Sequence, residues 1–392
     1  MRRRAWTVVL VVTACARPVM RPVEVVEPSL PRVSEAEVAR TIPRTVKDRD
    51  GWAADIVEAL DALELGRSPT SVCSVVAVIE QESGFNPNPV VPGLARIVQE
   101  RLDRYSAKLG LLGRPALHAL LQGHGPSSKE TFEQRLEHVK TEKDLDVIFR
   151  ELLDYYDRKY PTTMMLLDTL GGAFTASHLE DLNPVTTAGS MQVSVRYATQ
   201  QGEASGLTGS MVRDRLYTRR GGVHYGTARL LGYDAAYADP LYRFADYNAG
   251  LYASRNAALQ AQLAELTGFK LTADGDLLAY NRVGRPTDAL TNTVRALMAW
   301  RTRYARSLSD AQLRRDAATE KTAAFEATET WRALKRTYEH HAGRAPAYAR
   351  MPDVTITSPK MKRDRSTAWY ARNVNLRFQA CLGKLRARAP EA

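Results

Sequence analysis

Histidine and cysteine are scarce in this chain of 392 residues, which contains seven and three of them. The histidines form no His-x-x-x-His pair and the cysteines do not cluster, so we expect no metal site. The sequence also lacks the glycine-rich loops that bind phosphates or dinucleotides, and we therefore expect no cofactor. No apolar run after the first residues is long enough to cross a bilayer as a helix.

The N-terminus has the composition of an export signal. Three arginines precede a short apolar stretch, Ala5 to Val12, and Thr13, Ala14 and Cys15 follow it. Small residues before a cysteine resemble a lipobox, at which a lipoprotein precursor is cut and the cysteine is lipidated. We therefore expect residues 1–14 to be a signal peptide and Cys15 to carry lipid. An ordinary signal peptide with a chance cysteine is the alternative.

Location and charge restrict the partners. Because no aspartate follows Cys15, the usual sorting rule for lipoproteins favours the outer membrane, facing the periplasm. The formal net charge of +11 suits an anionic partner: nucleic acid, lipid headgroups or the carboxylates of cell-wall peptides. A lipidated periplasmic protein rarely meets nucleic acid, so we expect none. With Cys15 lipidated, Cys73 and Cys381 remain; they form either a disulfide or two separately buried thiols.

Residues 69–82 are predicted to form a buried helix. Ser68 is a suitable cap, Pro69 fits the first helical position, and Gly84 and Pro87 stop the helix. Glu82 continues an apolar stripe of Val72, Val75, Val76 and Ile79. Burial and the negative end of the helix dipole both favour a protonated Glu82, which suits a general acid. A Glu paired with an Arg, or a surface Glu, is the alternative.

Three segments resemble the motifs of the lytic transglycosylases related to goose-type lysozyme. They are Glu80–Pro87 (EQESGFNP), Ala188–Val193 (AGSMQV) and Ala245–Gly250 (ADYNAG), and they follow the order found in that family. The resemblance implies a lysozyme-like fold and cleavage of peptidoglycan glycan strands. The whole arrangement also resembles bacterial lipoproteins of a family with unknown function.

The resemblance also implies roles for single residues. Glu82 would be the general acid and then the base, and Ser83 would orient it. Met191, Gln192, Tyr247 and Asn248 would bind the substrate, Gln192 by hydrogen bonding. For Met191 and Tyr247 core packing is the alternative, and for Asn248 and Gly250 it is turn chemistry.

One carboxylate is enough for the reaction of that family. The 6-hydroxyl of the muramic sugar attacks its own anomeric carbon, and a 1,6-anhydro product results. Hydrolysis normally needs a second carboxylate. Glu180, Asp181 and Asp246 lie near the motifs, but we expect solvated or structural roles for them. A hydrolytic muramidase and a non-catalytic scaffold that binds peptidoglycan are the alternative functions.

The predicted architecture is mostly α. It consists of a lipidated, proline-containing, extended tether (15–48), a lysozyme-like α+β domain (49–290) and a helical C-terminal extension (291–392). The 109 positions from Glu82 to Met191 exceed the family's usual spacing, so residues 90–182 are predicted to be a helical insertion. It would serve as a lid, a reader of stem peptides or a docking site for an envelope protein.

Overall fold

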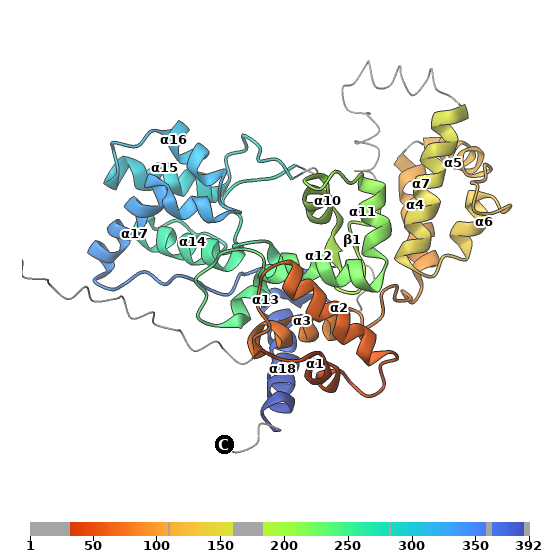
Figure 1. Cartoon of the computed structure of the whole chain (residues 1–392). Coiled ribbons are helices and arrows are strands. Elements are labelled where there is room, and N and C mark those ends of the chain that lie inside the picture. Colours follow the sequence, from red (N-terminus) through yellow and green to blue (C-terminus); the bar gives the residue numbers. More distant parts are fainter. Residues whose placement is uncertain (1–31, 109, 160–182, 282–283, 358–362, 388–392) are drawn as a thin grey trace, which may run out of the picture.

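The computed structural model describes residues 32–108, 110–159, 183–281, 284–357 and 363–387, and these are mostly helical, as predicted (Figure 1). Cys15, Glu180 and Asp181 lie outside the described residues. Within the described ranges, none of the helices combines the length and apolar character that a membrane span requires. No group of three His, Cys, Asp or Glu side chains in those ranges is arranged to hold a metal ion.

The central body of the molecule has the largest hydrophobic core. The helix α3 (Pro69–Glu82) lies in the middle of this core and is buried from Val72 to Ile79. Around it pack α1 (Glu35–Thr41), α2 (Arg49–Ala62), α10 (Val195–Glu203), α11 (Gly209–Leu216), α12 (Arg219–Leu231), α13 (Pro240–Ala249) and α18 (Thr367–Arg386). The strands β1 (Thr187–Ala188) and β2 (Val193–Ser194) form an antiparallel hairpin, with Ala188 opposite Val193.

The predicted tether is folded from residue 32 on, which corrects the sequence-based boundary at residue 48. Ser34 and Glu37 form a reciprocal capping box that begins α1. Val38 and Ile42 then pack into the core of the central body. The prediction of an extended tether was based on the prolines of this region, of which only Pro43 lies within the folded part, and it did not use the capping residues.

The predicted insertion forms a separate helical unit beside the central body (Figure 1). Its helices are α4 (Leu94–Lys108), η1 (Gly110–Leu112), α5 (Gly113–Leu121), α6 (Phe132–Glu137) and α7 (Glu142–Lys159). They enclose a small core around Phe132. A buried carboxylate, Asp146 on α7, joins the unit to the central body by accepting from Arg213 of α11 at 2.6 Å and from Asn183 at 2.6 Å.

A third core lies on the other side of the central body (Figure 1). It is built by α14 (Ala253–Thr267), α15 (Asn292–Tyr304), α16 (Asp310–Ala317), η2 (Ala323–Ala327) and α17 (Glu329–Ala342). The cores therefore part near residue 250 and not at the predicted boundary of 290. The hairpin β3 (Thr355–Ile356) and β4 (Arg365–Ser366) then leads the chain back to the central body.

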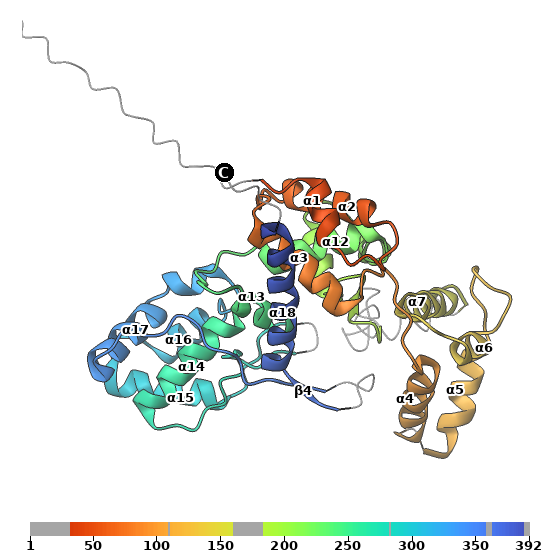
Figure 2. The same cartoon turned by 90° about the horizontal axis from the view of Figure 1, so that it is seen from below.

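The last helix returns to the first ones, which the prediction of a separate C-terminal extension did not foresee. Figure 2 shows α18 lying beside α3 and α13, with which it makes extensive contacts. A disulfide between Cys73 of α3 and Cys381 of α18 fixes this pairing, with the two Cα atoms 5.5 Å apart. Of the two alternatives for these cysteines, the structure contains the disulfide.

Candidate active site

Glu82 is the last residue of α3 and faces a cleft of about 610 Å³. Local sequence determines where the helix stops. Ser83 caps the end, with its hydroxyl donating to the Ile79 carbonyl and accepting from the Asn86 N–H. Gly84 and Phe85 follow with positive φ angles of 59° and 66°, which a helix cannot continue through. The carboxyl group is thus held at the C-terminal end of a buried helix, facing the cleft.

The surroundings of Glu82 favour its protonated form. Burial is the main cause and raises the pKa of Glu82 to about 7, against an ordinary value of 4.5. The hydroxyl of Tyr370, on α18, donates to Glu82 Oε1 at 2.5 Å and acts in the opposite direction. The negative charge of Glu142 raises the pKa further. A carboxyl group with these properties holds its proton near neutral pH and can donate it to a substrate.

Three of the predicted site residues line the same cleft as Glu82: Gln192, Tyr247 and Asn248. Gln192 adopts a left-handed backbone conformation (φ 49°), which is rare for a residue with a side chain and frequent at functional sites. Its amide oxygen accepts from Thr187 at 3.0 Å and its amide nitrogen donates to Glu142 Oε2 at 3.0 Å. The side chain is therefore held in one orientation beside the cleft.

Tyr247 is fixed from both ends. Its hydroxyl donates to the Met191 carbonyl at 2.8 Å, and the guanidinium of Arg229 lies 5.6 Å from its ring centre. Burial raises the pKa of Tyr247 far above its usual range, so the hydroxyl remains a donor. The neighbouring Asn248 accepts from the Thr367 hydroxyl at 2.8 Å, which connects the third motif to the start of α18.

The positions of Met191 and Ser83 differ from those that their implied roles require. The Met191 side chain is fully buried in the central core and does not line the cleft, so core packing describes it. Its site is shaped by Gly226 of α12, where a Cβ atom would stand only 2.2 Å from the Met191 sulfur. Ser83 adjoins Glu82, but the hydrogen bonds of its side chain hold the turn after α3.

Asp246, within the third motif, is structural, as expected. It is fully buried and accepts from the hydroxyls of Tyr233 and Tyr237 and from the backbone N–H of Ser254. Those donors hold the turn between α13 and α14. Gly250, in that turn, has a φ of 126°, which only glycine adopts readily, so turn chemistry describes it.

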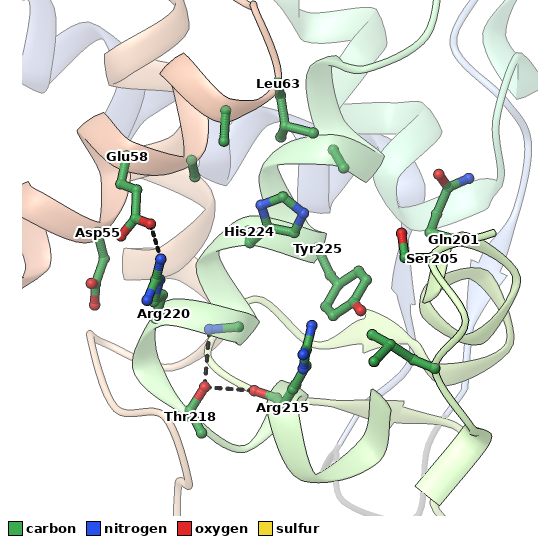
Figure 3. Close-up of a pocket in the computed structure, with 15 residues that line it drawn as sticks. Asp55, Glu58, Leu63, Gln201, Ser205, Arg215, Thr218, Arg220, His224 and Tyr225 are labelled. Carbon is green, nitrogen blue, oxygen red and sulfur yellow. Dashed lines mark hydrogen bonds and ion pairs between the residues drawn. The ribbon is translucent and has the colours of Figure 1, made fainter. Parts of the chain in front are cut away.

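A second pocket of about 660 Å³ is lined by residues of α2, α10, α11 and α12, and Glu82 is not among them (Figure 3). Its two acidic side chains are engaged in ion pairs, Asp55 with Arg219 and Glu58 with Arg220. Burial lowers the pKa of His224, so this imidazole is neutral at physiological pH. Since both acids are held in ion pairs, the cleft at Glu82 is the better candidate for chemistry.

Comparison with known proteins places this arrangement in a family. Residues 45–384 match the family described as "Protein of unknown function (DUF1615)". The chain belongs to this family. It is also similar to "Uncharacterized protein YaiW" of Escherichia coli K12, with 34% identity over 379 residues, 95% of this chain and 96% of that protein. No solved structure matches the chain. The family match includes the insertion and most of α18, so both belong to the unit that the family shares.

The residues of the cleft that were not predicted include Glu142 from the insertion, Arg229 from α12, and Trp369 and Tyr370 from α18. Glu142 and Tyr370 both act on the pKa of Glu82. A lone Glu that begins a helix, or a Tyr within one, has no local signal of function. Only the packing of α7 and α18 against the three motifs identifies them. The cleft is thus assembled from several distant parts of the sequence.

Proposed function

We propose that this protein is a lytic transglycosylase, which cleaves the glycan strands of peptidoglycan with Glu82 as its acid and base. The main support is Glu82 itself, a carboxyl group with a pKa of about 7 in an open cleft. The same cleft is lined by Gln192, Tyr247 and Asn248, which belong to the segments that resemble motifs of that enzyme family. The lysozyme-like character of the fold is part of this proposal.

The chemistry requires two proton transfers, one from Glu82 and one to it. Protonated Glu82 donates to the glycosidic oxygen, and the bond between that oxygen and the anomeric carbon breaks. The 6-hydroxyl of the same muramic sugar then attacks the anomeric carbon and gives its own proton to Glu82. No water is consumed, and the intramolecular nucleophile has a very high effective concentration. The product carries a 1,6-anhydro ring.

We further propose that the mature protein is anchored by lipid on Cys15 and faces the periplasm, where it would meet peptidoglycan and not nucleic acid. The supporting observation is the sequence before Cys15, and the Cys73–Cys381 disulfide is consistent with an oxidising compartment. Mass spectrometry of the protein purified from membranes tests the anchor: a lipidated N-terminal Cys15 is expected, and an unmodified N-terminus contradicts it.

Digestion of purified sacculi tests the activity, with mass spectrometry of the released muropeptides. We expect 1,6-anhydro products from the native protein and none from Glu82→Gln. Glu80→Gln is a matched control, because Glu80 lies two residues earlier on α3 and does not line the cleft. Products with reducing ends would indicate a hydrolase. Absence of products, with protein still bound to sacculi, would contradict catalysis and favour a binding role.

A further inference from the structure

The insertion supplies a second carboxylate to the cleft. We propose that Glu142 is a catalytic residue: its negative charge stabilises the positive charge that develops on the sugar when Glu82 protonates the glycosidic oxygen. This inference rests on the proposed function and deepens it. It differs from the expectation of a single catalytic carboxylate, and it gives the insertion a part in the reaction itself.

The position of Glu142 is well determined. It begins α7, where Thr141 and Asp144 form reciprocal hydrogen bonds at the helix start. Backbone pairing between Val91 and Lys140, at 2.9 Å, holds this start against the segment that follows α3. The start of the insertion and the start of α7 thus meet at the cleft, and Glu142 is 8% exposed there.

An ion pair one turn after Glu142 joins α7 to the central body. Asp146, one turn after Glu142, is fully buried and paired with Arg213 at 2.6 Å. This pair prevents the N-terminal turn of α7 from shifting along the surface of α11. Glu142 is therefore held against the central body that carries Gln192 and Glu82.

The two carboxylates occupy opposite electrostatic environments. Glu82 ends α3, where the helix dipole disfavours negative charge, whereas Glu142 begins α7, where the dipole favours it. The amide of Gln192 donates to Glu142 Oε2 at 3.0 Å and holds that oxygen beside the cleft. Two carboxyl groups at opposite helix ends match the division of labour between an acid and an electrostatic stabiliser.

The reaction needs such a stabiliser. When the glycosidic bond breaks, its electron pair stays with the leaving oxygen, which takes the proton of Glu82. Positive charge then appears on the anomeric carbon and the ring oxygen, and on the N-acetyl group if its carbonyl oxygen closes onto that carbon. An anionic oxygen of Glu142 in the cleft lowers the energy of this cation. Attack by the 6-hydroxyl removes the charge, and the proton of that hydroxyl reprotonates Glu82, so protons and charge balance.

The substitution Glu142→Gln removes the charge and preserves the shape, and Gln192 can still donate to the new amide oxygen. Glu137→Gln is the matched control, an exposed residue of the same unit outside the cleft. With sacculi as substrate, we expect kcat to fall about 100-fold or more while KM changes little. Glu137→Gln should retain native rates.

The pH profile separates this role from a purely structural one. Glu82 is faced by Tyr370 from α18, Tyr247 from α13, Arg229 from α12 and Glu142 from α7. Of these, Glu142 raises the pKa of Glu82 through its charge, so Glu142→Gln should move the alkaline limb to lower pH. Glu142→Asp keeps the charge and should leave the limb in place with a smaller loss of kcat.

The outcomes are distinguishable. If native protein releases anhydro products and Glu82→Gln does not, the proposed function stands, and a Glu142→Gln variant within threefold of the native kcat overturns the role of Glu142 alone. If native protein releases no product, the proposed function fails and this inference with it. If Glu142→Gln does not fold by circular dichroism, the pair Glu142→Asp and Glu142→Asn decides, because these variants have the same shape and differ in charge: a lower kcat for Glu142→Asn supports the proposal, and equal kcat values overturn it.

Discussion

The hydroxyl of Tyr370 donates to Oε1 of Glu82, across 288 positions of the sequence. Tyr370 lies on α18 and Glu82 ends α3, and the two helices are joined by the Cys73–Cys381 disulfide. Burial raises the pKa of Tyr370 far above its usual range, so the hydroxyl is always a donor. The C-terminal helix therefore lowers the pKa of a carboxyl group near the other end of the chain, against the larger effect of burial.

Tyr370→Phe should raise the pKa of Glu82 above its native value of about 7. The hydrogen bond favours the ionised carboxylate, so its loss favours the protonated form, by roughly one pH unit. The alkaline limb of the pH-rate profile then moves to higher pH, opposite to the shift expected for Glu142→Gln. A ¹³C NMR titration of the Glu82 carboxyl measures the same pKa without substrate. An unchanged titration would show that the hydrogen bond does not operate in solution.

Glu82→Gln should stabilise the protein at alkaline pH. The pKa of Glu82 is about 7 in the folded state and near 4.5 in the unfolded state, so the folded state binds more protons between these values. Stability is consequently lost as pH rises through this window, at most roughly 3 kcal/mol from this group. Urea denaturation should give a higher free energy of unfolding for the variant at pH 8 and little difference at pH 4. A gain that is equal at both pH values contradicts this origin.

The Cys73–Cys381 disulfide should affect both stability and the active site. It closes a loop of about 300 residues, so replacing both cysteines by serine is expected to cost roughly 3–5 kcal/mol. Since α18 carries Tyr370, loosening it also removes a partner of Glu82. Urea denaturation of the native protein with and without a reducing agent checks the first effect. The double variant should not respond to the reducing agent; if it does, another group is the source.

Local signals predicted the parts of the site that depend on local structure. The serine cap, Pro69 and the apolar stripe predicted α3 and the position of Glu82, and the motifs predicted that Gln192 and Tyr247 would meet it. The start of α1 was missed although Ser34 and Glu37 carry its capping box. The prediction followed the proline content of the whole tether and overlooked the capping box from Ser34 to Glu37.

The remaining part of the site depends on long-range packing, for which one sequence has no periodic signal. Glu142 and Tyr370 each belong to a helix whose own pattern only says that one face is buried. Which helix covers that face follows from the three-dimensional arrangement of the cores. Met191 is an example of a local signal that packing overrides. Its motif predicted that Met191 would line the cleft, but Gly226 allows α12 to pack closely over the Met191 side chain and bury it.

Trp369 should bind substrate without taking part in the chemistry. It lines the cleft, is 38% exposed, and the guanidinium of Arg365 lies 4.9 Å from its ring centre. Aromatic faces in clefts offer apolar surface to the C–H faces of sugar rings. In a Glu82→Gln background, which binds without cleaving, Trp369→Ala should weaken binding to sacculi about tenfold, equal to about 1.4 kcal/mol. Leu376→Ala is the control, since Leu376 is an exposed residue of α18 outside the cleft. Equal binding by both variants would place the glycan on another surface, because the exposed aromatic face of Trp369 would then not contact it.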